Sequence, residues 1–235
     1  FYAISPMHSE AVAFLTGRSE LLAAVFVFSA WLCLDGGSAP GRRGPGVALF
    51  ILGLLSKETV FLFPALLALS DWVFHRRTPW QKERRQVHAL LAAGTCAVLA
   101  ARWAVLPELV AGGLPYFSSR LTAALTFPGF AWAHYLWPSL TGLGQCSDYS
   151  RPLIPDAGLS SVSAWLSLAA MAALMGGGLW SAVRRRSPAG FWIAGPAFFL
   201  LPGSHLILPL DSIGAERFLY LPLMGLCVGV GSAYA

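Results

Sequence analysis

A lysine and a glutamate stand side by side at Lys57 and Glu58, inside a stretch from residue 46 to residue 75 that is otherwise almost wholly apolar. Ionisable side chains at membrane depth cost several kcal/mol unless they are paired or face water, so such a pair indicates a functional site. The alternative is the tip of a helical hairpin, where two charges simply reach the surface. The pair alone does not decide between these interpretations.

A second polar group comes near the start of the chain. Ser9 has the residue type of a helix N-cap, and a helix that starts there would bring Glu10, Gly17 and Arg18 within about two turns. These residues would then lie at the mouth of the apolar stretch that follows. The alternative is a capped helix start with an arginine at the membrane interface.

A third polar group, Glu216 and Arg217, stands directly before the last apolar run. The planar guanidinium of arginine suits the oxygens of a phosphate, whereas lysine acts as a point charge. A site that holds an anionic lipid phosphate beside the membrane would use this mixture of Lys57 and Arg217. The alternative is a pair of side chains that extend to the surface from a helix end.

A fourth group lies in a long polar segment, where Asp148 and Tyr149 precede Ser150 and Pro152. Asp148 suits a sugar-binding or catalytic carboxylate, and Tyr149 a stacking platform. A turn before proline explains Asp148 equally well. His134 and His205 are isolated and lack metal-ligand spacing, so we expect no metal site.

The composition restricts the class of protein. Hydrophobic residues make up 56% of the 235 residues and charged residues 11%, against roughly 25% charged in a soluble domain. We therefore expect an all-α protein, a polytopic bundle of transmembrane helices. The chain starts without methionine and ends inside an apolar run, so we expect an internal piece of a longer protein.

The apolar runs predict the membrane helices. They are Ala11 to Leu34, a divided run from Gly46 to Phe74, Val87 to Leu106, Val162 to Val183, Phe191 to Leu201, and Phe218 onward.

Basic residues orient these helices, because lysine and arginine concentrate in cytoplasmic loops. Ten of the 16 basic residues fall in three loops, at residues 42–43, 76–85 and 184–186. We place these loops on the cytoplasmic side, which explains the net charge of +5 without a nucleic-acid partner. The other polar groups then share the outer face.

This orientation requires the divided run to cross out and back as a hairpin, with Lys57 and Glu58 at its outer turn. Its first limb, residues 46–56, would be about 16 Å long at 1.5 Å per residue, too short for a bilayer, so we expect the pair to be recessed in an outward-facing cavity. Residues 107–161 form an external loop. Within it, Leu121 to Trp137 predicts a helix in or dipping into the outer interface, or else two short crossings.

Four segments in order resemble one family. They are the segment from Pro6 through His8 to Ala23, the segment from Ser56 to Thr59, the segment from Asp148 to Ser150, and the segment from Gly214 through Arg217 and Tyr220 to Pro222. Together they are similar to the transmembrane and tetratricopeptide-repeat protein O-mannosyltransferases and their bacterial relatives, of the GT-C superfamily. Ser5 departs from the family, which commonly has histidine before this proline.

The resemblance implies a GT-C-like membrane domain over residues 1–235 that transfers a sugar, mannose by analogy, from a polyprenyl or dolichyl phosphate to a protein hydroxyl on the extracytoplasmic face. We expect the transfer to need no cofactor. Lys57, Arg217 and Arg18 would bind the donor phosphate. The supporting or sugar-binding residues would be His8, Glu10, Glu58, Glu216, Tyr220, Asp148 and Tyr149.

The resemblance also implies that the catalytic acid lies upstream of Phe1 and that the tetratricopeptide repeats follow the last helix, so the chain would be inactive alone. The alternatives are a polytopic transporter or lipid flippase, and a non-catalytic membrane scaffold. The composition favours a bacterial inner membrane, with the endoplasmic reticulum membrane second.

Overall fold

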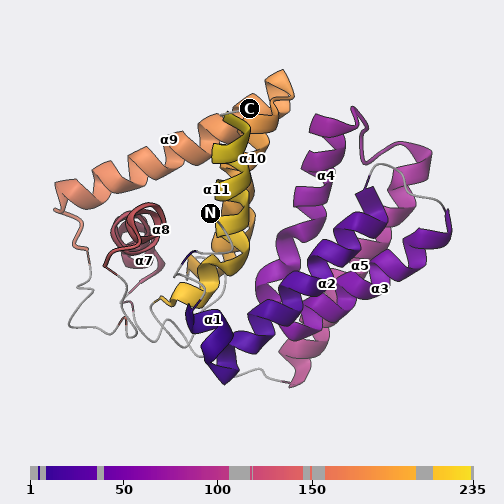
Figure 1. Ribbon diagram of the computed structural model, residues 1–235, viewed down its shortest axis with the longest axis horizontal. Coiled ribbons are helices and arrows are strands. Elements are labelled where there is room, and N and C mark those ends of the chain that lie inside the picture. The colour runs from indigo at the N-terminus through magenta and orange to yellow at the C-terminus, as the bar shows by residue number, and fades with distance from the viewer. Residues whose placement is uncertain are drawn as a thin grey trace.

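The computed structural model describes residue 5 and residues 9–35, 40–105, 117, 119–144, 149, 157–204 and 214–233. All regular elements in these ranges are helices, which confirms the all-α prediction (Figure 1). Short helices α1 (Ser9–Ala13), η3 (Leu15–Gly17) and η8 (Glu216–Leu219) lie at the same end of the molecule as the turn after α3 (Pro40–Ser56).

The predicted break at Lys57 is confirmed, and the membrane crossing of the two limbs stays a prediction. Helix α3 packs along α2 (Arg18–Leu34), and the chain breaks at Lys57, whose backbone is extended (φ −154°, ψ 130°). After the short η5 (Glu58–Leu62), helix α4 (Phe63–Phe74) runs back to the other end. The predicted start of the first limb is wrong, because α3 has 17 residues. That is about 25 Å at 1.5 Å per residue, so shortness of the limb does not explain the depth of Lys57.

The single helix predicted from Ala11 to Leu34 is also wrong, since α1 and α2 are separate. Phe14 is extended (φ −89°, ψ 140°), and the chain turns through η3 before α2 begins. The backbone of Gly17 lies so close to that of Ala11 that a β-carbon on Gly17 would overlap it. A glycine permits this approach, and the break directs α1 toward η8, which it contacts.

Helices α2, α3, α4 and α5 (Lys82–Val105) form one group, in which α5 packs on α3. A second group consists of α9 (Val162–Arg185), α10 (Pro188–Leu200) and α11 (Tyr220–Ala233). Gly178 and Gly190 let α9 and α10 approach closely, because a β-carbon on either residue would overlap the facing helix. Helices α10 and α11 contact α4 and α2 respectively, and so join the groups.

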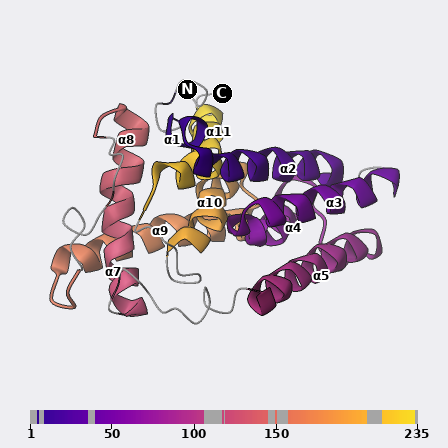
Figure 2. The ribbon, with the colours of Figure 1, turned by 90° about the horizontal axis from the view of Figure 1, so that it is seen from below.

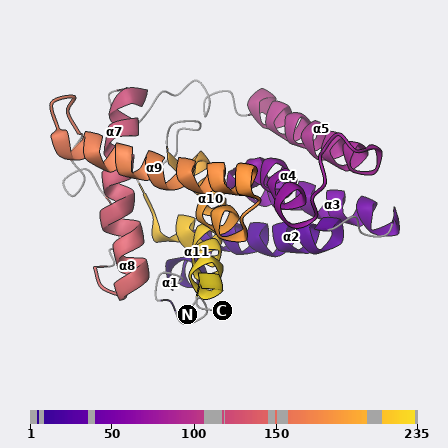
Figure 3. The same ribbon diagram turned by 90° about the horizontal axis from the view of Figure 1, so that it is seen from above.

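The helices α7 (Arg120–Phe130) and α8 (Trp137–Thr141) are joined by a π-helical stretch, η6 (Ala131–Leu136), into one continuous rod. The rod crosses α9 in Figures 2 and 3. A single helix was the main prediction for this region, and the alternative of two short crossings is wrong because the rod contains no reversal. Pro128 does not interrupt it, since helical backbone continues on both sides.

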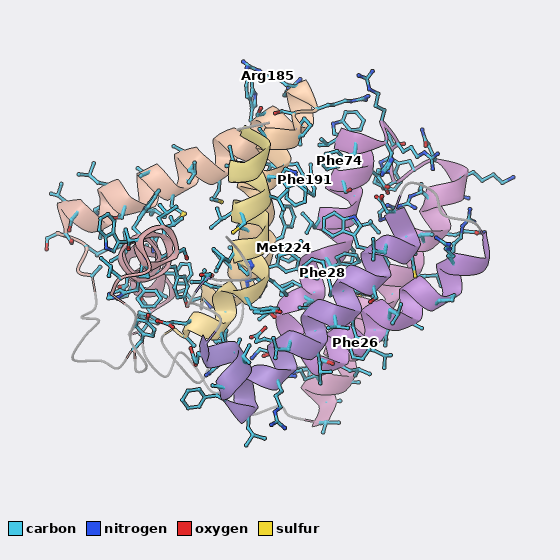
Figure 4. The ribbon with its side chains drawn as sticks, viewed as in Figure 1. Phe26, Phe28, Phe74, Arg185, Phe191 and Met224 are labelled. Carbon is cyan, nitrogen blue, oxygen red and sulfur yellow. The ribbon has the colours of Figure 1, made fainter. Side chains whose placement is uncertain are left out.

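The basic segments at residues 76–85 and 184–186 lie at one end of the bundle, where side chains join neighbouring helices. The Trp72 indole of α4 donates to the carbonyl of Val183 on α9 at 2.8 Å, and Arg84 of α5 donates to the carbonyl of Leu34 on α2 at 2.7 Å. Figure 4 shows Arg185 at this end, which we call the basic end. The end formed by α1, η5 and η8 lies opposite, and we call it the paired-charge end.

Two helices in the described ranges are long and apolar enough to cross a membrane, at residues Arg84–Val105 and Val162–Arg185. Only 11% of the residues in the most apolar window of each are buried within the protein. Helix α10 is apolar but shorter.

Candidate functional site

Lys57 occupies the break between the two limbs of the hairpin. Its ammonium lies 3.2 Å from Oε1 of Glu20, a carboxylate that α2 carries in its first turn and that is only 3% exposed. The Lys57 side chain itself is 17% exposed. The ammonium is therefore partly neutralised by a buried acid and still open on one side.

Arg217 lies in η8, just before α11. Its Nη1 donates to Oε1 of Glu10 at 2.6 Å, and its backbone N–H donates to Oε2 of the same carboxylate at 3.1 Å. Glu10 thus binds both the side chain and the backbone of a residue 207 positions away. This contact joins α1 to the start of the last helix.

Phe218 brings the two cations together. The Lys57 ammonium lies 5.3 Å from the centroid of the Phe218 ring, and the Arg217 guanidinium carbon lies 5.4 Å from it. Both distances fall within the range of cation–π attraction. One aromatic ring therefore holds in one place two positive charges from the middle and the end of the sequence.

Glu58, the neighbour of Lys57, is directed to another partner. Its Oε2 lies 3.3 Å from Nη1 of Arg102, near the end of α5. The Arg102 side chain is 41% exposed, so water screens this pair. Arg102 lies in the last turn of α5, which brings it to the same end of the molecule as Glu58.

Glu216 and Ala215 are held by two tyrosines. The Tyr149 hydroxyl donates to Oε1 of Glu216 at 3.1 Å. The Tyr135 hydroxyl donates to the carbonyl of Ala215 at 3.1 Å and accepts from its N–H at 3.2 Å. Burial raises the pKa of Tyr135 above its ordinary value, so the phenol stays protonated and can make both bonds.

The predicted site residues are therefore only partly brought together. Glu10, Lys57, Glu58, Glu216, Arg217 and Tyr149 lie at the paired-charge end. Tyr220 follows η8 as the first residue of α11. Arg18 is exposed and makes no ion pair with a described residue. His8 and Asp148 lie outside the described residues.

Three residues of this end were not among the predicted site residues: Glu20, Arg102 and Tyr135. Glu20 carried a readable signal, because an acid next to an apolar run must find a cation if it is buried. Arg102 carried the same signal in an apolar helix. Tyr135 carried none, since its position depends on a π-helical stretch.

A small apolar groove of about 20 Å³ lies between α2, α4, α10 and α11. Phe28, Phe191 and Met224 line it, and Figure 4 shows them between these helices. Leu221, three residues after Phe218, also lines the groove. The groove is therefore close in sequence, along α11, to the two cations.

The arrangement suits the binding of an anion with an apolar part. Two cations beside one ring can donate hydrogen bonds to phosphate oxygens, the guanidinium through its planar fork and the ammonium as a point charge. Among the described residues, no three His, Cys, Asp or Glu side chains lie close enough together to hold a metal ion.

The fold and the site together define an all-helical protein with ion pairs at both ends, one of which also carries basic segments. Comparison with curated proteins confirms the resemblance seen in the motifs. The chain is 26% identical to a protein O-mannosyl-transferase of Caenorhabditis elegans, 26% to protein O-mannosyl-transferase TMTC4 of Mus musculus, and 25% to protein O-mannosyl-transferase TMTC1 of Homo sapiens. Each match covers 97% of this chain.

The chain spans about a third of the length of these relatives, between 31% and 36%. No protein-family model matches the chain. No solved structure matches it either.

Proposed function

We propose that this chain is the donor-binding part of a membrane glycosyltransferase. The enzyme transfers a sugar, mannose by analogy with the named relatives, from a polyprenyl or dolichyl phosphate to a hydroxyl group of a protein. The names of the relatives support the transferase class. The placement of Lys57 and Arg217 on one phenylalanine ring is the observation that carries the donor site.

The exposed apolar surface supports a position in the bilayer. The two long helices are mostly unburied, and large apolar side chains such as Leu90, Trp103, Leu166 and Trp180 are exposed on them. Such extended apolar surface favours contact with lipid. In this arrangement the basic end faces the cytoplasm and the paired-charge end faces outward, since lysine and arginine concentrate in cytoplasmic loops.

The donor has two chemical parts, and the chain offers a feature for each. The phosphate would lie beside Phe218, between the Lys57 ammonium and the Arg217 guanidinium. The polyprenyl chain would lie against the exposed apolar surface of the long helices, because the groove beside Leu221 is too small to hold it. A lipid-linked phosphate therefore fits these features better than a free sugar nucleotide, which has no apolar tail.

The two cations would stabilise the phosphate as it leaves the sugar. Negative charge develops on the phosphate oxygens as the glycosidic bond breaks, and fixed positive charges lower the barrier to this step. A general base must take the proton from the acceptor hydroxyl. By the family resemblance that base lies upstream of Phe1, so transfer requires the longer protein.

The test is a transfer assay on the complete protein, with a lipid-phosphate mannose donor. Lys57→Met and Arg217→Gln should each lower the rate by about 10²-fold or more, the typical cost of removing one donor to a developing anion. Lys82→Met and Arg85→Gln at the exposed basic end are matched controls and should keep the rate. Unaltered transfer in both site variants would remove the two residues from the donor site.

The alternative of a transporter predicts polar groups along several helices near their middles. Among the described residues, the ion pairs lie at the two ends. No observation favours the scaffold alternative over an enzyme. The particular membrane stays a prediction.

A further inference from the structure

Three aromatic residues each contact one of three successive residues that lead to Arg217. Gly214 lies against the Phe130 ring so closely that a β-carbon at Gly214 would overlap it. The Tyr135 hydroxyl bonds both backbone polar groups of Ala215. The Tyr149 hydroxyl bonds the Glu216 carboxylate. We call Phe130, Tyr135 and Tyr149 the aromatic clamp.

The π-helical stretch explains how the clamp is assembled. In an α-helix, positions five apart point about 140° away from each other around the axis. The i→i+5 bonding of a π-helix brings such positions to one face. Phe130 and Tyr135 are five apart at the start of η6, and their ring centroids lie 4.9 Å apart. Tyr149 packs on Phe130 at 5.3 Å.

The clamp holds the backbone directly before η8, where the Ala215 carbonyl also accepts from the N–H of Phe218 at 3.1 Å. Ala215 is extended (φ −157°, ψ 142°) directly before η8, with no side-chain cap on the helix. One buried phenol satisfies its N–H and its carbonyl together. Two residues later, Glu10 binds the backbone N–H and the guanidinium of Arg217. Arg217 is thus held from α1 on one side and from the rod on the other.

We infer that Phe130, Tyr135 and Tyr149 are positioning residues for donor binding, which set the backbone position from which Arg217 reaches the donor phosphate. This inference rests on the proposed function. It assigns a purpose to the rod and to Tyr149 beyond the packing of the rod on α9. It also explains the glycine at position 214, since a β-carbon there would overlap the Phe130 ring.

The first test removes one oxygen. Tyr135→Phe in the complete protein keeps the ring and removes both phenol bonds to Ala215, so the Ala215 N–H loses this partner while its carbonyl keeps the N–H of Phe218. A small displacement of a binding group can cost from about tenfold to 100-fold in catalysis, and we expect a rise of this size in the KM for the lipid-phosphate sugar. The control Trp132→Phe removes a hydrogen bond from the same rod to Ser167 on α9 and should leave this KM unchanged.

The second test enlarges the side chain at Gly214 and then shrinks the side chain at Phe130 that it would overlap. Gly214 has a backbone conformation open to alanine, so in Gly214→Ala only the Phe130 ring is in the way. Gly214→Ala should raise the donor KM, and Gly214→Ala with Phe130→Ala should lower it again toward the wild-type value. A purely structural role would instead reduce the amount of folded enzyme and leave the donor KM unchanged.

The outcomes are distinguishable. A raised donor KM in Tyr135→Phe and Gly214→Ala, with recovery in the double variant, supports the inference. Unchanged donor KM values in both single variants, against an active wild type, overturn the inference alone. A wild-type protein that neither transfers sugar from the lipid donor nor binds polyprenyl phosphate overturns the proposed function, and the inference with it.

Discussion

The two ends of the bundle both contain ion pairs, but they are built differently. At the basic end Asp71 is fully buried, and Arg84 donates to both of its carboxylate oxygens at 2.7 and 2.8 Å. His88 lies 3.0 Å from the same carboxylate, and Arg84 also donates to the carbonyl of Leu34. At the paired-charge end, Lys57, Arg102 and Arg217 have side chains that are 17%, 41% and 23% exposed.

This difference separates a structural lock from a binding site. A buried carboxylate that is bound by a bidentate arginine and a histidine has its hydrogen bonds satisfied, so the contact fixes α2, α4 and α5 against one another. Cations that remain partly exposed keep room for a ligand. We therefore expect changes at the basic end to affect folding, and changes at the paired-charge end to affect function.

The largest effect should follow Arg84→Ala. The change leaves the Asp71 carboxylate buried without its main partner, which typically costs about 3–5 kcal/mol. The loss of unfolding free energy is measured on the complete protein in detergent, by titrating it with a denaturing surfactant and recording how much protein is unfolded. Replacing both partners, with Asp71→Leu and Arg84→Leu, should cost less than Arg84→Ala alone, because no buried charge remains. Equal losses in the two variants would contradict the role of the lock.

Arg217→Lys should change function and leave stability nearly unaltered. Lysine keeps the positive charge but loses the planar fork that suits phosphate oxygens. We expect transfer to fall about tenfold, which corresponds to about 1.4 kcal/mol, with an unfolding free energy close to that of the wild type. A large loss of stability would show that Arg217 with Glu10 is a lock like the pair at the other end.

The sequence predicted the helices and the hairpin because apolar runs and basic loops are local signals. It placed the turn at Lys57 correctly, since a charge pair in an apolar run must reach an end. It missed residues 40–45 of α3, because Pro40 and the glycines and arginines after it look like a loop. Proline is in fact well tolerated where a helix starts. It also missed the break between α1 and α2, which depends on the contact of Gly17 with Ala11.

The sequence could predict which residues belong to the site, but not which of them form ion pairs with one another. Lys57 and Glu58 are neighbours in sequence, and yet Lys57 pairs with Glu20 and Glu58 with Arg102. Partners from distant segments are chosen by packing, as in the contact of Glu10 with Arg217 across 207 positions. The clamp was beyond reach for a similar reason, because a π-helical stretch rotates Tyr135 onto a face that an α-helical pattern would not give it.

The smallest effect should follow Arg102→Gln. This pair with Glu58 is partly exposed, and such pairs contribute about 0.2–1 kcal/mol after screening by water and salt. The unfolding free energy should therefore fall by less than about 1 kcal/mol, and less still at high salt. Transfer should stay within about twofold of wild type, a change of about 0.4 kcal/mol, since Arg102 is not placed on Phe218 with Lys57 and Arg217. A loss of transfer as large as that of Lys57→Met would extend the donor site to α5 and would remove the distinction between a functional centre at Phe218 and a merely structural pair beside it.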